Sequence, residues 1–317
     1  MADIFSLAPL QGITDFIFRK LICTCFKGID KVYTPFLRLQ NDKTLKRAQI
    51  VDVLPENNVG VNLIPQILCN NVDDFVFLGG YLSDLGYSEI NWNLGCPYPM
   101  VAKRKLGSGL LTYPDMINSI LETGLPKVNC DVSIKLRSGY ESEEEIFKLL
   151  PILNQFPLKE LIVHPRIARQ MYKGSANVDT VEKSLSIYKG NVVYNGDIKD
   201  INSFSLIKNR LDGIKHWMIG RALISNPFLV EELISLKKIE HVNKIDRFSA
   251  FYNDLYNYYN VSLSGPGHLL NKMQNFWEYF SLSFSNSHKV WKQIKKSKSI
   301  EKLNQEVQAI FRNEEFV

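Results

Sequence analysis

Apolar and polar residues alternate along the first 240 positions in a regular rhythm. Short apolar runs, each ending in polar or turn-forming residues, occupy 4–7, 31–34, 60–68, 87–92, 132–137, 158–163, 191–194 and 216–219. Segments with helical spacing lie between or after them, at 16 onward, 72–83, 114–121, 142–154, 179–188, 201–209 and 228–237. Eight strands alternating with helices over about 235 residues predict a (β/α)8 TIM barrel.

A doubly wound parallel sheet is the alternative arrangement for the same rhythm. Such sheets commonly carry a G-x-G-x-x-G turn after the first strand. Here the first run is followed by Ala8-Pro9-Leu10-Gln11-Gly12, which lacks that fingerprint. The barrel is therefore the preferred prediction.

The pattern changes beyond residue 240. Helical spacing continues over 245–259, 268–284, 287–296 and 300–311, with breaks at Gly265-Pro266-Gly267 and Ser285-Asn286. No alternating strand pattern occurs in this part. We predict two domains, a catalytic barrel over 1–240 and a small all-helical domain over 241–317.

Composition adds few constraints. The 317 residues are 45% hydrophobic and 22% charged, as in ordinary globular proteins. No apolar run is long enough for a bilayer, and the start Met1-Ala2-Asp3 has no basic segment typical of secretion signals. We expect a cytoplasmic protein with no membrane contact, and a monomer. Five scattered cysteines predict no disulfide framework, and the pair Cys23 and Cys25 lacks the further ligands of a metal site.

Positive charge is concentrated rather than spread. The net charge is +5, and residues 286–302 contain a single acid, Glu301, against Lys289, Lys292, Lys295, Lys296, Lys298 and Lys302. A second basic cluster is formed by Lys103, Arg104 and Lys105. Such faces either are simply solvated or bind a phosphate backbone, so a nucleic acid is a candidate partner.

Polar residues stand at the ends of six predicted strands. They are Gln66, Asn93 with Cys96, Lys135 with Arg137, His164, Asn195 with Asp197, and Gly220 with Arg221. Together they would make an unfavourable core, but the carboxyl ends of barrel strands are where active sites lie. We therefore expect them to line one pocket.

The types of these residues favour a flavin mononucleotide (FMN). The last two strand-to-helix loops of barrels commonly bind phosphate, and here they carry Asn195-Gly196-Asp197 and Gly220-Arg221. Amides such as Gln66 and Asn93 can pair with the edge of a planar heterocycle. Lys135 would place positive charge beside a ring that becomes anionic on reduction.

Cys96 is the candidate catalytic group. A cysteine is usually a small buried residue. Here Gly95 and Pro97 flank it after the predicted strand 87–92, which predicts a thiol held in a loop at the barrel mouth.

Several stretches, in this order, resemble the motif series of the tRNA-dihydrouridine synthases. They are 8–15 (APLQGITD), 93–97 (NLGCP), 135–139 (KLRSG), 164–166 (HPR), 195–198 (NGDI) and 219–221 (IGR). The resemblance covers the whole barrel. The basic region beyond 240 is similar to that family's tRNA-binding domain, in particular that of the bacterial C-type members, which act in the D-loop.

The resemblance implies an activity and a role for each matched residue. The family uses FMN, reduced by NADPH, to reduce the C5–C6 double bond of uridines in tRNA; hydride passes from flavin N5 to C6, and the matched Cys96 protonates C5. Residues implied to line the flavin are Pro9, Gln66, Lys135, His164, Asn195, Gly196, Asp197, Gly220 and Arg221. Those implied to hold the uracil are Asn93, Arg166 and Tyr172, while Lys103, Arg104, Lys105, Lys292 and Lys295 would contact tRNA phosphates.

One position departs from the family pattern, because Pro165 stands where glycine is usual between the histidine and Arg166. Two other functions are compatible with the residues. One is a flavin barrel acting on a small molecule, similar to dihydroorotate dehydrogenases, and the other is an RNA-binding protein without catalysis. The basic helical region argues against the first, and the joint presence of Cys96, Lys135 and His164 argues against the second.

Overall fold

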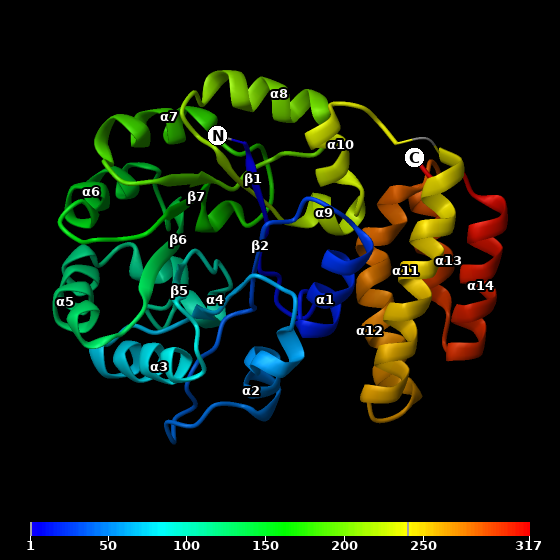
Figure 1. Ribbon diagram of the computed structural model, residues 1–317, viewed down its shortest axis with the longest axis horizontal. Coiled ribbons are helices and arrows are strands. Elements are labelled where there is room, and N and C mark those ends of the chain that lie inside the picture. The colour runs from blue at the N-terminus through cyan, green and yellow to red at the C-terminus, as the bar shows by residue number, and fades with distance from the viewer. Residues whose placement is uncertain (1, 240) are drawn as a thin grey trace.

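The computed structural model describes residues 2–239 and 241–317. Its centre is one sheet of nine parallel strands that curls into a nearly closed barrel, in the order β3-β2-β1-β9-β8-β7-β6-β5-β4 (Figure 1). The strands are β1 (Ile4–Leu7), β2 (Lys31–Tyr33), β3 (Leu63–Ile64), β4 (Gln66–Ile67), β5 (Glu89–Leu94), β6 (Asp131–Gly139), β7 (Leu161–Ile167), β8 (Val192–Tyr194) and β9 (His216–Ile219).

The prediction of eight strands is wrong by one, and Pro65 is the reason. The single strand expected over 60–68 is divided into β3, which pairs with β2, and β4, which pairs with β5. Proline has no backbone N–H to donate to a ladder. Its carbonyl still accepts from Asn91 N at 2.8 Å, and the preceding Ile64 carbonyl accepts from Thr34 N at 3.2 Å. The two edge strands of the sheet, β3 and β4, are thus joined covalently through Pro65.

Helices surround the strands, as the alternating pattern predicts (Figure 1). The longer ones are α1 (Phe16–Cys25), α2 (Arg47–Val53), α3 (Val72–Asp84), α5 (Pro114–Gly124), α6 (Glu144–Leu153), α7 (Val178–Ile187), α8 (Ile201–Arg210) and α10 (Leu229–Ser235); α4 (Pro99–Ala102) and α9 (Arg221–Ser225) are short. Several begin at side-chain caps. Asp15 accepts from Phe18 N at 3.2 Å, and Asn71 accepts from Asp74 N at 2.9 Å.

Four helices follow the barrel and lie together beside it: α11 (His241–Ser262), α12 (Pro266–Phe280), α13 (Ser287–Lys296) and α14 (Ile300–Asn313) (Figure 1). They confirm the helices expected beyond residue 240. Phe18 of α1 stacks on Phe276 of α12 at 5.4 Å between ring centroids, and lies edge-on to Phe251 of α11 at 6.0 Å. These helices therefore share an aromatic core with the barrel. Their status as a separate domain stays a prediction, and residue 240, where the expected boundary falls, lies outside the described residues. No helix in the described ranges is long and apolar enough to cross a lipid bilayer.

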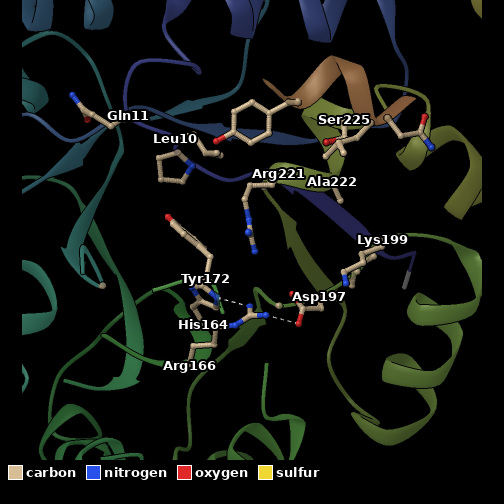
Figure 2. A pocket seen from close by; sticks show the side chains of 18 of the residues that line it. Leu10, Gln11, His164, Arg166, Tyr172, Asp197, Lys199, Arg221, Ala222 and Ser225 are labelled. Atoms are coloured by element: carbon tan, nitrogen blue, oxygen red, sulfur yellow. Dashed lines mark hydrogen bonds and ion pairs between the residues drawn. The ribbon is translucent and has the colours of Figure 1, made fainter. Parts of the chain in front are cut away.

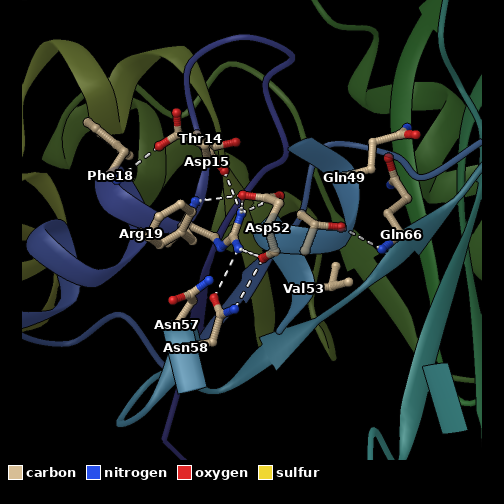
Figure 3. A network of polar contacts seen from close by, with 12 residues as sticks. Thr14, Asp15, Phe18, Arg19, Gln49, Asp52, Val53, Asn57, Asn58 and Gln66 are labelled. Carbon is tan, nitrogen blue, oxygen red and sulfur yellow. Dashed lines mark hydrogen bonds and ion pairs between the residues drawn. The ribbon is translucent and has the colours of Figure 1, made fainter. Parts of the chain in front are cut away.

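A buried ion pair fixes the segment that leads from β1 into α1 (Figure 3). The fully buried Arg19 guanidinium donates to both Asp52 carboxylate oxygens at 3.1–3.2 Å, to Thr14 O at 2.8 Å and to Asn58 Oδ1 at 3.0 Å. Asp52 also accepts from Phe16 N at 2.7 Å. One arginine thus joins α1 to α2 and to the 3-10 turn at Pro55–Asn58.

Asp52→Ala should destabilise the protein strongly. The substitution leaves the buried guanidinium of Arg19 without its counter-charge, which typically costs about 3–5 kcal/mol. The measurement is the free energy of unfolding from urea denaturation. Glu141→Ala is the matched control, since the Arg169–Glu141 pair is more than half exposed on both sides, and it should change stability by less than about 1 kcal/mol. Equal effects of the two substitutions would contradict a structural role for the buried pair.

Candidate active site

A cavity of about 1020 Å³ opens at the carboxyl ends of the strands. Its lining includes twelve of the site residues expected from the sequence: Pro9, Gln66, Asn93, Cys96, Lys135, His164, Arg166, Tyr172, Gly196, Asp197, Gly220 and Arg221. Figure 2 shows Tyr172 and Arg221 projecting into the open space between Leu10 and Asp197. Residues from seven separate loops and strands thus meet in one place.

The other expected residues do not line the cavity. Asn195 is buried behind it and donates from Nδ2 to the Met218 carbonyl at 2.8 Å, which joins β8 to β9. The basic residues Lys103, Arg104, Lys105, Lys292 and Lys295 are exposed on the surface. Their expected contacts with phosphates stay predictions.

Strand register explains why the charged residues converge. Asn93 lies opposite Lys135 in the ladder between β5 and β6, and Arg137 lies opposite His164 between β6 and β7. Residues two apart on a strand point to the same face. Lys135 and Arg137 are therefore directed together into the barrel mouth.

The loop that carries Cys96 is held from both ends. Asn93 Oδ1 accepts from Gly95 N at 3.0 Å and from Cys96 N at 2.9 Å. The Cys96 carbonyl accepts from Ser108 N at 3.1 Å and from Ser108 Oγ at 2.8 Å. Gly107 has a φ of +55°, and a Cβ there would come within 2.8 Å of Cys96. Glycine at 107 lets the following segment pack directly against the cysteine.

A chain of buried hydrogen bonds supports this loop from inside the barrel. Asn93 Nδ2 donates to Gln66 Oε1 at 2.7 Å, and Gln66 Nε2 donates to Asn91 Oδ1 at 2.8 Å. Asn91 Nδ2 continues to Ser133 Oγ at 3.0 Å, and Ser133 Oγ lies 2.9 Å from Glu89. Because each side chain in this series is hydrogen-bonded to the next, Asn93 and Gln66 are oriented before any ligand binds.

Arg166 and Asp197 are paired with each other at one side of the cavity (Figure 2). The distance from Arg166 Nη2 to Asp197 Oδ2 is 2.7 Å, and the same nitrogen donates to the Gly174 carbonyl at 2.7 Å. Arg166 Nη1 lies 3.3 Å from His164 Nε2. Burial and the charges of Lys135, Arg137, Arg166 and Arg221 hold the pKa of His164 well below its usual value. His164 is therefore neutral and can accept from Arg166.

Lys135, Arg137 and Arg221 line the cavity, and none of them forms an ion pair with a carboxylate of the described residues. The side chains of Lys135 and Arg221 also make no hydrogen bond with any residue that the structure describes, although the Arg221 guanidinium stacks over the Tyr172 ring at 4.3 Å. Burial and the adjacent Arg137 lower the pKa of Lys135 to about 7. Burial likewise lowers the pKa of Arg137 to about 10. The site is therefore arranged to receive negative charge.

The thiol of Cys96 keeps its proton at neutral pH. Its side chain is largely buried, and burial raises its pKa. The backbone N–H of Tyr98 and the positive charges of Arg137 and Lys135 oppose this shift without reversing it. A protonated thiol can act as a general acid.

Three cavity residues were given no specific role from the sequence, although Arg137 was among those expected to line the pocket, and it does line it. Arg137 donates from Nε to Gly95 O at 3.0 Å and from Nη1 to Ile167 O at 3.1 Å, so it joins three strand-end loops. Its position two residues after Lys135 puts it on the same face of the strand. Tyr98 and Tyr279 also line the cavity. Tyr279 comes from α12, and nothing local in the sequence indicates that this helix reaches the barrel mouth.

Lys135→Met should change how the stability of the ligand-free protein depends on pH. Between about pH 7 and the ordinary value of 10.5, the unfolded chain holds a proton on Lys135 that the folded chain releases, so wild-type stability rises with pH in this window. The variant should therefore be more stable than wild type, and the difference in unfolding free energy should be largest below about pH 7. At about pH 10 this difference should be smaller by roughly 1–3 kcal/mol, a range that allows for screening by solvent in the cavity.

The measurement is urea denaturation at several pH values. Lys148→Met, at an exposed lysine of α6, is the matched control. If the difference in unfolding free energy between Lys135→Met and wild type were the same at every pH, Lys135 would not titrate in this window.

The barrel is similar to those of several solved enzymes. The structure of the old yellow enzyme from Trypanosoma cruzi matches with a TM-score of 0.53 at 12% identity, over 75% of this chain and 89% of that one. Morphinone reductase matches with a TM-score of 0.51 at 13% identity, over 75% and 87% of the two chains. At such identities the likeness establishes the TIM-barrel fold and nothing more.

Sequence relatives are more informative. The tRNA-dihydrouridine synthase B of Pasteurella multocida is 29% identical over 236 residues, which cover 73% of this chain and 68% of the relative. The tRNA-dihydrouridine(16) synthase of Aquipseudomonas alcaligenes is 25% identical over 240 residues, 73% and 75% of the two chains. The family model for dihydrouridine synthase (Dus) matches residues 6–315. Since that match spans almost the entire sequence, the chain belongs to the dihydrouridine synthase family.

Proposed function

We propose that this protein reduces the C5–C6 double bond of specific uridines in tRNA to give dihydrouridine, with FMN as cofactor and NADPH as reductant. The observation that carries the proposal is the position of the Cys96 thiol, whose pKa burial raises, in a cavity that also holds the unpaired cations Lys135 and Arg221. Family membership and relatives named tRNA-dihydrouridine synthases support the same reaction.

The residues of the cavity fit FMN in size and in donor chemistry. Its volume of about 1020 Å³ lies at the upper end of the range for cofactor pockets. The unpaired guanidinium of Arg221 suits a phosphate group, and Gly196 and Gly220 have no side chain to keep that group away from the backbone. Lys135 suits the ring edge that becomes negative on reduction. In this proposal Pro9, Gln66 and His164 complete the flavin contacts, Asn195 supports them from behind, and Asp197 acts by holding Arg166.

FMN, when bound and reduced, supplies a hydride from N5 to C6 of the uracil. The chain's own part is to deliver a proton to C5 from the opposite face, and Cys96 does this in the proposed mechanism. Burial keeps the proton on its sulfur at neutral pH. The fixed loop between Asn93 and Ser108 sets the direction of the S–H group. Positioning of the acid is what makes such proton transfer efficient.

Asn93 and Tyr172 are the proposed contacts for the uracil itself. Asn93 uses one amide hydrogen toward Gln66, so the second is available to a carbonyl oxygen of the base. The Tyr172 ring stacks against the Arg221 guanidinium. The Tyr172 side chain is 40% exposed in the cavity, where it can pack against the base. Arg166 is bound to Asp197 and Gly174, and it therefore shapes this wall rather than reaching freely toward the substrate.

The remaining parts of the proposal concern the macromolecular substrate. The exposed cations Lys103, Arg104, Lys105, Lys292 and Lys295 would contact tRNA phosphates, with the helices beyond residue 240 acting as a tRNA-binding domain of a monomeric enzyme. Relatives named synthase B and (16) synthase match at similar identity, so the resemblance to C-type enzymes stays a prediction.

An anaerobic titration of the holoprotein tests the proposal directly. We expect a flavin absorbance spectrum that NADPH bleaches and unmodified tRNA restores, with dihydrouridine formed in amounts equal to the flavin reoxidised. A flavin that NADPH bleaches but tRNA does not restore would point to a small-molecule substrate. A protein that neither contains nor takes up flavin would rule the reaction out.

Cys96→Ala should slow reoxidation of the reduced flavin by tRNA by about 10²–10⁴-fold, because the general acid is lost. Flavin retention, reduction by NADPH and the dissociation constant for tRNA should stay close to wild type. Cys130→Ala, at a half-buried cysteine that does not line the cavity, is the matched control. Wild-type reoxidation in Cys96→Ala would remove Cys96 from the mechanism.

A further inference from the structure

Tyr98 is an aromatic side chain at the cavity mouth to which neither the sequence nor the reaction assigns a role. It lines the cavity two residues after Cys96, yet its side chain is 49% exposed. Tyrosine is enriched at binding interfaces, because its ring is apolar and its hydroxyl group is polar. A ring that both lines the cavity and faces solvent is placed to contact a ligand that extends out of the cavity.

The backbone around Tyr98 is fixed relative to the thiol. Pro97 and Pro99 flank the residue, which has the extended angles φ −61° and ψ 129°. Its N–H is directed to the sulfur of Cys96, and its carbonyl accepts from Val101 N at 2.8 Å and Ala102 N at 2.9 Å. Because the backbone is already fixed, only the two side-chain torsions of Tyr98 have to be ordered when something stacks on its ring.

The surroundings of Tyr98 have the composition of a single-stranded RNA surface. The same segment exposes Met100, Tyr113 and the three cations Lys103, Arg104 and Lys105. The helix α12 contributes the half-buried Tyr279 to the lining of the same cavity. Aromatic rings interleaved with cations bind unpaired nucleotides by stacking on the bases while the cations hold the phosphates.

We propose that Tyr98, with Tyr279 lining the same cavity, stacks on an unpaired base next to the uridine that enters the cavity. The inference rests on the proposed function, since it assumes that a tRNA loop is the substrate. A uracil that reaches Cys96 must leave its neighbours in the loop, and that unstacking is unfavourable. When the Tyr98 ring stacks on the neighbouring base, it replaces the stacking that this base loses. Only the target uridine then enters the cavity.

The test compares tRNA binding by the oxidised holoprotein in wild type, Tyr98→Ala and Tyr98→Phe at several salt concentrations. Tyr98→Ala should raise the dissociation constant roughly 5- to 100-fold, the range expected for one base–aromatic contact. Tyr98→Phe keeps the ring and should bind like wild type. Stacking involves no counterion release, so the salt slope should be unchanged in Tyr98→Ala, whereas replacing Lys292 and Lys295 together by alanine should flatten it.

Phe77→Ala is the matched control, because Phe77 on α3 is 50% exposed, does not line the cavity and lies outside the helices beyond residue 240. Its tRNA dissociation constant should equal that of wild type. Retained flavin and an unchanged circular dichroism spectrum would show that the Tyr98 variants are folded.

A second measurement identifies the stacked base. Once wild-type turnover has located the reduced uridine, transcripts carrying an abasic nucleotide on either side of it are bound to both proteins. At one side the abasic change should weaken wild-type binding but have no further effect on Tyr98→Ala. Additive losses at both sides, wild-type affinity in Tyr98→Ala, or equal weakening by Tyr98→Phe would each overturn the inference. If tRNA fails to reoxidise the reduced wild-type flavin, the proposed function fails instead, which is a separate result.

Discussion

Repulsion among cations at the barrel mouth is the constraint on which the site depends. Lys135, Arg137, Arg166 and Arg221 all lie near His164, and among the cavity-lining residues described only Asp197 forms an ion pair with one of them. Buried like charges raise the free energy of the folded state, and the protein lowers this cost by keeping His164 neutral and weakening the hold of Lys135 on its proton. A ligand carrying phosphate and a reducible ring would supply the missing negative charge, so binding of such a ligand would also stabilise the folded protein.

The same constraint explains why so much of the barrel interior is polar. Arg137 is held by the carbonyls of Gly95 and Ile167, which satisfies its donors without neutralising its charge. The hydrogen-bonded chain from Asn93 through Gln66 to Asn91 fills the layer beneath. An apolar layer would be more stable, but it could not fix the Cys96 loop. The structure therefore trades core stability for an oriented thiol.

The sequence predicted the barrel and most of the cavity because polar residues at strand ends leave a local signal. It missed the division at Pro65, since a proline in an apolar run was treated as part of one strand. It could not foresee that Arg166 and Asp197 pair with each other, because their loops meet only through the parallel pairing of β7 with β8. Tyr279 was missed for the same reason, as its helix reaches the mouth only through tertiary packing.

That packing bears on how the helices beyond residue 240 act. α12 is joined to the barrel by the stacking of Phe276 on Phe18, and by Lys272, which donates to Asp15 at 2.7 Å and to the Gly12 carbonyl at 2.8 Å. Both partners belong to the loop after β1, whose earlier residues line the cavity. A helix that contributes Tyr279 to the mouth is thus held by the loop that contributes Pro9. Under the proposed function, RNA bound along these helices would be placed relative to the cavity through the loop after β1, so the same contacts would support both binding and catalysis.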